Sequence, residues 1–260
     1  MYGVNDFPAL LQMSPISLSE MSAVSLMNRT DTKFVTSADR LAILLVQAKD
    51  AGYRVCQIAG ERLMSYESVY YDTEGLDMFT AHRNKKLVRQ KVRVRRYITT
   101  GQTFLEIKRK NNHARTKKKR LLIPPDCIMC LNKAVEAPQF IESRTAWRLE
   151  DLMPETTTDF DRITLVDGNL TERITIDLNL SFDNLRNGNS VSLGPLVIIE
   201  LKQDGSMHSG FRDILLRNRI FPYRISKYCI AVSLTVPSAR IGRFKEKIRY
   251  IEKITGRKLI

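Results

Sequence analysis

Residues 89–110, RQKVRVRRYITTGQTFLEIKRK, carry basic side chains in a pattern that could bind phosphate. The segment is typical of two β-strands around a turn at residues 99–102, and successive side chains of a strand point to opposite faces. The charged side chains that would share one face are Lys91, Arg93, Arg95, Glu106, Lys108 and Lys110. Arginine binds phosphate oxygens in a bidentate manner and lysine acts as a compact point charge, so this face suits a triphosphate or a longer phosphate chain.

An acidic residue two positions before a lysine recurs on three of the expected strands. The three pairs are Asp31 and Lys33, Glu106 and Lys108, and Glu200 and Lys202. A carboxylate among phosphate-binding cations is expected where a divalent metal binds, because Mg²⁺ or Mn²⁺ is typically held by one or two carboxylates plus substrate phosphates. The alternative is that each acid only pairs with its neighbouring cations, and for Glu106 the sequence leaves both interpretations open.

The positive charge of the chain is concentrated in one segment. The formal net charge is +14, yet residues 81–120 hold 16 lysines and arginines and a single acidic residue. This concentration indicates a local site for a polyanion such as nucleic acid, anionic lipid or a phosphate chain. Within residues 89–110 the aromatic residues are Tyr97 and Phe104, whereas single-strand binders place stacking platforms among their charges, so no specific nucleic-acid role is expected.

Cysteine usage and hydropathy predict a cytoplasmic protein without a membrane span. The 260-residue chain has four unevenly spaced cysteines, as expected of reduced thiols in a protein large enough to fold without disulfides. Cys127 and Cys130 have zinc-like spacing, but they lack a second pair and the three histidines are scattered, so no zinc site is expected. The longest apolar run covers only residues 41–46, and there is no secretory signal.

Familiar nucleotide-binding and catalytic motifs are absent from the sequence. There is no G-x-x-x-x-G-K-[ST] phosphate loop and no G-x-G-x-x-G dinucleotide fingerprint. The few histidines also leave no convincing Ser/His/Asp or Cys/His set. The chemistry is therefore expected to come from the alternating charges themselves.

Short strands with a period of two are the elements that would position these charges. Strands are predicted at 29–36 and 68–72, in a hairpin at 88–110, and at 116–123, 173–180, 197–203 and 226–233. Helices are predicted at 37–52, 126–137, 208–218 and 239–256. In the strand at 173–180, the polar residues expected to share one face are Arg173, Thr175, Asp177 and Asn179.

A barrel would give these alternating strands one charged face and one apolar face. In a closed barrel, alternating positions face either the lumen or the exterior, and helices can cover an apolar exterior. A lumen lined by many cations would be strongly unfavourable without anions, because like charges repel strongly in a cavity of low dielectric constant. The pattern therefore favours a tunnel that holds a phosphate-rich ligand over a surface patch for any polyanion.

Eight short motifs occur in an order and spacing that resemble those of one known family. They are RTDTKFV, YYDTEGLDMF, KVRVRRY, FLEIKRK, ESRTAW, RITIDLNL, VIIELK and RISKY, within roughly residues 25–235. The chain resembles the VTC domain, the polyphosphate polymerase module of the vacuolar transporter chaperone complex, which belongs to the triphosphate tunnel metalloenzymes. The resemblance implies an α+β fold that is mainly antiparallel β. In this fold, eight strands form a closed β-barrel tunnel and the helices pack outside it. It places this single domain at 26–260, with a C-terminal helix, after a leader or short helix at 1–25.

The resemblance also implies roles for individual residues. The residues assigned as catalytic are Arg93, Arg95, Lys108 and Lys202. Contacts with the substrate phosphates are implied for Arg29, Lys33, Lys118, Arg120, Arg144, Arg173 and Lys227, with Lys118 and Arg120 selected by alternation within TKKKR. Glu200 matches the metal-binding glutamate of the family, which implies a divalent metal cofactor, Mn²⁺ or Mg²⁺.

The implied reaction is a metal-dependent phosphoryl transfer between two partners, a nucleoside triphosphate and polyphosphate. The terminal phosphate of the nucleotide, expected to be ATP, would join a growing chain inside the tunnel, with release of the diphosphate. The first strand has Arg29-x-Asp31-x-Lys33 and lacks the E-x-E-x-K signature of the triphosphatase and cyclase branch, which favours the polymerase. Two alternatives stay open: a triphosphatase that uses water as acceptor, and a catalytically silent module that binds polyphosphate or another polyanion.

Overall fold

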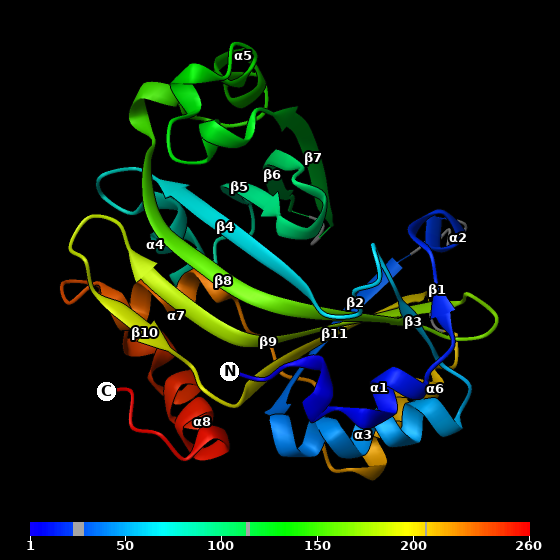
Figure 1. Cartoon of the computed structure of the whole chain (residues 1–260). Coiled ribbons are helices and arrows are strands. Elements are labelled where there is room, and N and C mark those ends of the chain that lie inside the picture. The colour runs from blue at the N-terminus through cyan, green and yellow to red at the C-terminus, as the bar shows by residue number, and fades with distance from the viewer. Residues whose placement is uncertain (23–28, 113–114, 206) are drawn as a thin grey trace.

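The centre of the protein is one curved β-sheet, seen in the computed structural model of Figure 1, which describes residues 1–22, 29–112, 115–205 and 207–260. Eight strands follow one another across it in the order β2 (Arg29–Ser37), β11 (Leu196–Asp204), β9 (Glu172–Asn184), β8 (Met153–Val166), β4 (Met64–Asp72), β5 (Arg89–Tyr97), β6 (Thr103–Lys110) and β7 (Thr116–Ile123). Each of these neighbouring pairs is antiparallel. The predicted α+β, mainly antiparallel class is confirmed.

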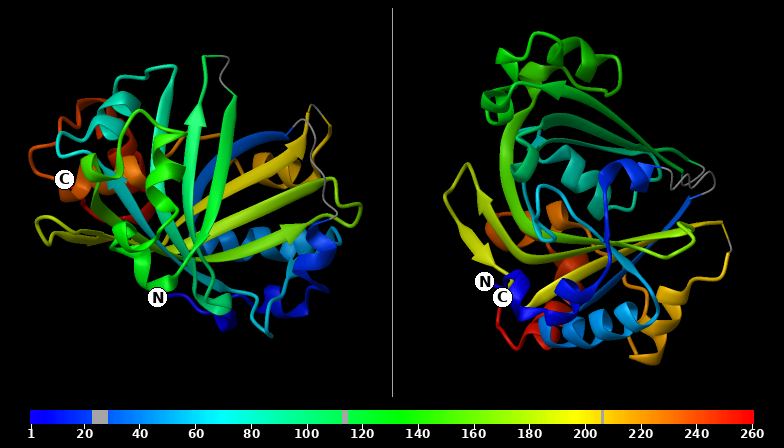
Figure 2. Two further views of the ribbon diagram at one scale, coloured as in Figure 1. Left: turned by 90° about the horizontal axis from the view of Figure 1, so that it is seen from above. Right: turned by 45° about the vertical axis from the view of Figure 1, so that its right-hand side comes forward.

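The sheet does not close into the barrel expected from the sequence. Across the residues that the structure describes, β2 and β7 are the two edges and do not pair with each other, so the sheet is an open half-barrel (Figure 2). The outer edge of β2 is already occupied, because the Tyr223 N–H donates to the Lys33 carbonyl at 2.6 Å and Phe34 forms a bridge with Pro222. The prediction of a closed eight-stranded barrel is therefore wrong, although eight strands do follow one another across the sheet.

Helices cover the convex face of β2, β11 and β9. They are α1 (Pro8–Gln12), α3 (Ala38–Asp50) and α6 (Gly210–Arg217), seen below the sheet in Figure 1. The apolar stripe predicted for the second of these is buried, with Leu41, Leu44 and Leu45 fully covered in one core that also holds Ile176 and Ile199. This core fixes which face of the three strands is left for the charged side chains.

The convex face of β4 to β7 carries a second cover made of short helices. These are the 3₁₀ turns η3 (Pro125–Ile128), η4 (Leu131–Lys133) and η5 (Leu149–Asp151) together with α5 (Ala137–Glu142). They bury Val92, Val94, Leu105 and Ile107 of β5 and β6. The prediction of a helix at 126–137 is therefore wrong, because the chain forms two 3₁₀ turns there and the α-helix begins only at Ala137.

The segment SKYCIAVS, predicted as a strand, is the helix α7 (Lys227–Thr235). Almost all of its residues are buried, so the apolar run has no helical stripe and resembles a buried strand. Ser226 begins the helix, since its hydroxyl accepts the Cys229 N–H at 3.3 Å. With α4 (Asp77–Arg83), η6 (Gly242–Phe244) and α8 (Lys245–Thr255), the helix packs against one end of the concave side of the sheet.

A single irregular residue divides β9 into two halves. Asn179 has a left-handed backbone, with φ of 55°, and the pairing with β8 shifts register between Asp159 and Asp161. Before this residue, Leu178 packs in the core of α3 and α6, and after it Leu180 packs with α7. Asn179 therefore does not share the face of Asp177 as predicted, and the concave side of β9 changes from polar to apolar at this point.

Residues 1–22 pack against the main body rather than standing apart. They form η1 (Val4–Asp6), α1, β1 (Pro15–Ile16) and α2 (Leu18–Ser22), and β1 pairs with β3 (Arg54–Cys56), while β10 (Ser190–Ser192) pairs with β9. The Arg62 guanidinium donates to the carbonyls of Leu10, Leu11 and Met13 at 2.7 to 3.0 Å. The division predicted at residues 25 and 26 lies outside the described residues.

Within the described ranges, no helix combines the length and the apolar composition needed to cross a membrane.

Candidate functional site

Charged side chains from seven strands and one helix meet on the concave face of the half-barrel. We call them the cationic cluster, because basic residues outnumber acidic ones. Its members are Lys33 of β2, Lys91, Arg93 and Arg95 of β5, Glu106 and Lys108 of β6, Lys118 of β7, Arg162 of β8, Asp177 of β9, Glu200 and Lys202 of β11, and Lys227 of α7. The strand alternation that the sequence shows is the reason they share one face.

The Glu106 carboxylate lies at the centre of the first group of charges. Arg93 donates to one of its oxygens from Nε at 2.8 Å and from Nη2 at 2.5 Å, and Lys118 Nζ donates to the other oxygen. Arg93 also donates to the Tyr70 hydroxyl at 3.1 Å. Burial alone would raise the pKa of Glu106, but Arg93, Arg95 and Lys118 outweigh burial and hold its pKa below the usual range. For this residue the structure favours ion pairing over metal binding.

The Asp177 carboxylate organises a second group that the sequence did not reveal. Arg162 binds it in a bidentate manner, with Nε and Nη2 at 2.6 and 2.9 Å from its two oxygens, and Lys227 Nζ lies 2.5 Å from one of them. Lys227 also lies 3.0 Å from the centre of the Phe160 ring. Burial opposes the charge of Asp177, yet Arg162 and Lys227 keep its pKa below the usual range. Arg162 was missed because β8 was not recognised, although FDRITLV does alternate between its two faces.

The Glu200 carboxylate lies near cations from both sides of the curved sheet. It lies 3.2 Å from Lys202 Nζ, which also donates to the Thr175 hydroxyl at 3.1 Å. Burial opposes its charge, but Lys202, Lys33 and Lys108 together hold the pKa of Glu200 below its usual range. Because β9, β8, β4 and β5 lie between β11 and β6 in the sheet, an effect of Lys108 on Glu200 means that the curvature brings these strands opposite each other.

Two cations of the cluster, the buried Arg95 and the half-buried Lys108, have no carboxylate bound to them. Arg95 donates to the Ser68 hydroxyl at 3.0 Å and lies over the rings of Tyr66 and Phe160, at 5.5 and 5.3 Å. Lys108 makes no hydrogen bond or ion pair with any residue that the structure describes. Arg93 and burial lower the pKa of Lys108 well below its usual range, and burial and Arg93 lower that of Arg95. Such groups are stabilised by an anion.

The remaining predicted residues lie in three different settings. Arg120, on β7, is exposed and lies 4.7 Å from the centre of the Phe104 ring, on the concave face. Arg173 occupies the position on β9 beside Lys202, and Arg29 begins β2, with a side chain outside the described part of the structure. Arg144 follows α5 and lies 4.2 Å from the centre of the Phe140 ring, on the convex side, so the structure does not bring it to the cluster.

The acidic residues of the cluster allow only a simple metal site. No group of three or more potential metal ligands occurs in the described part of the chain. Glu106 and Asp177 are each held by two cations, whereas Glu200 has one ion pair and a side chain that is 23% exposed. The residues therefore fit a divalent ion that takes one ligand from Glu200 and the others from phosphate and water, as Mg²⁺ commonly does.

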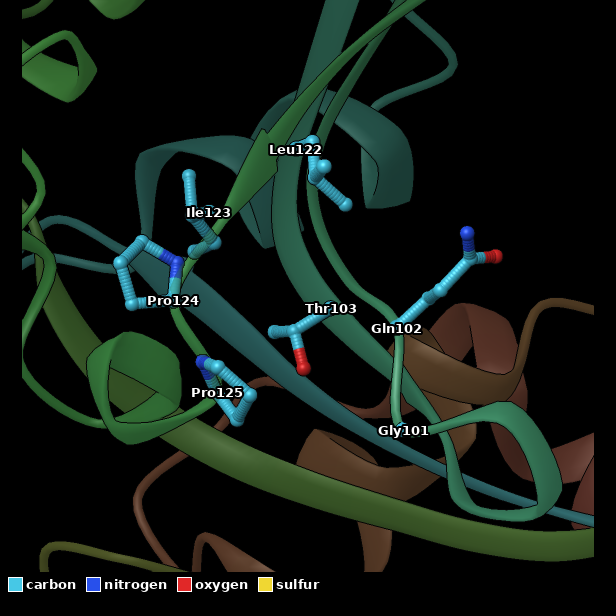
Figure 3. Close-up of a pocket in the computed structure, with 7 residues that line it drawn as sticks. All are labelled: Gly101, Gln102, Thr103, Leu122, Ile123, Pro124 and Pro125. Carbon is cyan, nitrogen blue, oxygen red and sulfur yellow. The ribbon is translucent and has the colours of Figure 1, made fainter.

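Two surface hollows lie outside the cluster. One, of about 370 Å³, is shown in Figure 3 between the turn before β6 and the end of β7. Its walls are Gly101, Gln102, Thr103, Leu122, Ile123, Pro124 and Pro125, none of which is charged. The chemistry of this hollow does not suit phosphate, so the cationic cluster is the candidate site.

Solved structures of other proteins share the overall fold of this chain. The structure is similar to HpAC1 from Hippeastrum, a candidate adenylyl cyclase described as having a dominant triphosphatase activity (TM-score 0.50, 12% identity, 82% of this chain and 98% of that chain). It is also similar to a candidate adenylate cyclase from Vibrio parahaemolyticus (TM-score 0.45, 11% identity, 78% and 97% of the two chains). At this identity, the likeness to HpAC1 concerns the fold alone.

The family follows from the sequence itself. The model of the VTC domain matches residues 28–236, which is most of the chain, and the protein belongs to that family. No curated protein matches it. Membership of the VTC family supports a role that involves polyphosphate.

Proposed function

We propose that the protein is a polyphosphate polymerase, which transfers the terminal phosphate of a nucleoside triphosphate, ATP foremost, to a growing polyphosphate. The observation that carries the proposal is a pair of cations, the buried Arg95 and the half-buried Lys108, that have no carboxylate partner in the described structure. Both lie beside Arg93, so an uncompensated positive field fills the concave face. A chain of phosphates supplies the compensating charge, and the VTC family supports a chain rather than an isolated anion.

The residues of the cluster would act by positioning and by electrostatic stabilisation. Phosphoryl transfer needs little covalent chemistry from a protein, because charge on the transferred group and alignment of the acceptor dominate its barrier. Arg93 and Arg95 would orient the donor phosphates, and Lys108 and Lys202 would face the transferred group. Glu200 would hold a divalent ion, Mn²⁺ or Mg²⁺, which would supply charge neutralisation on the leaving diphosphate.

The outer members of the site would hold the phosphates on either side of the reacting group. This substrate-binding role is proposed for Lys33, Lys118, Arg120, Arg162, Arg173 and Lys227, with Arg29 at the start of β2. Glu106 and Asp177 would fix the directions of the cations that they bind, since a carboxylate held in two ion pairs restricts both partners. Arg144 is not included, because it lies on the convex side.

A triphosphatase is the second candidate, favoured by the description of HpAC1. The same cluster could bind a triphosphate while water takes the place of the acceptor phosphate. The two reactions differ in where the γ-phosphate is found. It becomes free phosphate in hydrolysis and acid-labile chains in polymerisation.

The compartment is proposed from the thiols. All four cysteines are free and three of them are buried. Buried free thiols are typical of proteins in a reducing environment, so we propose the cytoplasm as the location.

The test is an incubation of the protein with ATP and Mn²⁺, followed by a gel for polyphosphate and an assay for free phosphate. The Lys108→Ala variant should lose about 100-fold or more in chain synthesis, because it removes a cation that faces the reacting phosphates. Arg109→Ala is the matched control, since Arg109 is the next residue of β6 and is exposed on the opposite face. Full activity of the Lys108 variant would overturn the site, and release of free phosphate without chains would replace the polymerase by the triphosphatase.

Binding specificity gives an independent check on the class of ligand. Tripolyphosphate should displace a bound phosphate chain far better than a DNA oligomer of equal charge at matched salt, because Arg93, Arg95 and Lys202 are buried and cannot follow a duplex backbone. A DNA oligomer that competes as well as tripolyphosphate would contradict the proposed ligand.

A further inference from the structure

Basic residues continue beyond the cationic cluster at one end of β5 and β6. Lys110 and Arg89 come two residues after Lys108 and two before Lys91, on the same faces of their strands, and they are paired directly across the sheet. Both are partly exposed. The positive face of the two strands therefore extends past the proposed reaction site to the rim of the half-barrel.

Two other elements add cations to this rim. Arg224 lies just before α7, and Lys247 of α8 donates to the Arg224 carbonyl at 2.6 Å. Burial and then Arg89 and Arg224 lower the pKa of Lys110, while burial and then Lys85 and Arg224 lower that of Lys247, where Glu246 opposes the shift. We name Arg89, Lys110, Arg224 and Lys247 the rim patch. None of the four forms an ion pair with a described carboxylate.

His82 of α4 shows that the rim patch and the cationic cluster are contiguous. Burial first, and then Lys91, Arg89, Lys33 and Lys110, together lower its pKa to about 2. Two of these cations belong to the cluster and two lie at the rim, so one side chain lies close to both. No carboxylate separates them along β5 or β6, since Glu106 lies on the far side of Lys108.

At the other end of β5 and β6, the concave face carries aromatic side chains in place of cations. Beyond Arg95 and Glu106 the concave face of β5 and β6 carries Tyr97 and Phe104, which pack edge to face with ring centres 5.7 Å apart. From Arg95 to Arg89 the chain advances six residues, or roughly 20 Å at the rise of a β-strand. This length exceeds a triphosphate but suits a longer phosphate chain, and the charge continues in only one direction.

We propose that the rim patch is a second anion subsite, which holds the polyphosphate chain where it leaves the cationic cluster. The inference rests on the proposed function, since a triphosphate alone would not reach the rim. Retention of the chain at this subsite would keep the product bound between successive additions. Loss of the subsite would therefore shorten the product chains more than it slows the first transfer.

The experiment compares two double variants of equal net charge. Lys110→Ala with Arg224→Ala removes two cations of the rim patch, and Arg109→Ala with Lys117→Ala removes two exposed cations from the opposite face of β6 and β7. Affinities for long-chain polyphosphate and for tripolyphosphate are measured without nucleotide or metal. The rim variant should lose at least tenfold in affinity for the long chain and less than twofold for tripolyphosphate, whereas the control should lose less than twofold for both.

Two outcomes would overturn the subsite. In one, the rim variant loses affinity equally for both ligands, and in the other it behaves as the control does. The binding comparison does not need catalysis, so it decides the subsite even if the wild-type protein makes no chains from ATP. The absence of chains would count against the proposed function only.

Discussion

The pKa values of buried carboxylates are shifted in opposite directions on the two faces of the sheet. On the concave face, cations hold the pKa values of Glu106, Asp177 and Glu200 below their usual range. On the convex face, burial and then the neighbouring Glu67 and Asp183 together raise the pKa of Asp159 to about 6. Burial opposes ionisation on both faces, so the sign of the neighbouring charge decides the outcome. On the concave face, cations outnumber the carboxylates, and a polyanion can compensate this excess.

The largest effect is expected from a variant that removes the central carboxylate of the concave face. Glu106→Gln leaves the buried Arg93 without its carboxylate partner, and the partly exposed Lys118 loses the same partner. The free energy of unfolding at neutral pH should therefore fall by about 3–5 kcal/mol. Because the pKa of Glu106 is lowered in the folded protein, its stabilisation is present above its unfolded pKa and is lost as pH falls. Urea denaturation at neutral and acidic pH measures both effects.

The matched control for this change is on the convex face. Glu67 pairs with Arg96 in a partly exposed ion pair, so Glu67→Gln should cost no more than about 1 kcal/mol. Equal losses for the two variants would show that the two faces do not differ as described. Tripolyphosphate should restore part of the stability lost in the Glu106 variant, because a bound anion stabilises the folded protein. No stabilisation by tripolyphosphate would contradict anion binding on the concave face.

The next test concerns the carboxylate that is most open to a metal. Glu200→Gln should lower ATP-dependent activity about 100-fold, because it removes the proposed ligand of the divalent ion. Without metal, the same variant should bind tripolyphosphate more tightly than the wild type, since it removes one negative charge from the cluster. Activity assays over a range of Mn²⁺ concentration, together with calorimetry, separate these effects. Unchanged metal dependence would exclude Glu200 as the ligand.

The smallest expected effect is on the convex face. The pKa of Asp159 is raised in the folded protein, so its favourable contribution is present below its unfolded value of about 4 and is lost as pH rises to about 6. Asp159→Asn should therefore stabilise the protein above pH 6, by less than about 1 kcal/mol because solvent screens the site. The gain should vanish below pH 4. A gain that is independent of pH would indicate a cause other than the charge.

Local alternation in the sequence was enough to predict most of the cluster. The cations of β2, β5, β6 and β11 follow a period of two, and the fold keeps them on one face. Arg162 was not predicted, because threonines occupy much of the polar pattern of its strand. The open edge depends on a contact between β2 and residues 222 and 223, which are far apart in the chain. Such pairings leave no local pattern, and neither does a helix buried on all sides, as α7 is.

The left-handed residue Asn179 divides β9 into a polar half that belongs to the site and an apolar half that supports α7. Substitutions at the two ends of the strand are expected to affect stability independently. Arg173 belongs to the polar half of the strand and Phe182 to the apolar half, and about 30 Å of strand separates them. Substitutions at such distances usually have additive effects on stability. Charges near Arg173 can therefore be re-engineered for other polyanions while the packing around Phe182 under α7 is left unchanged.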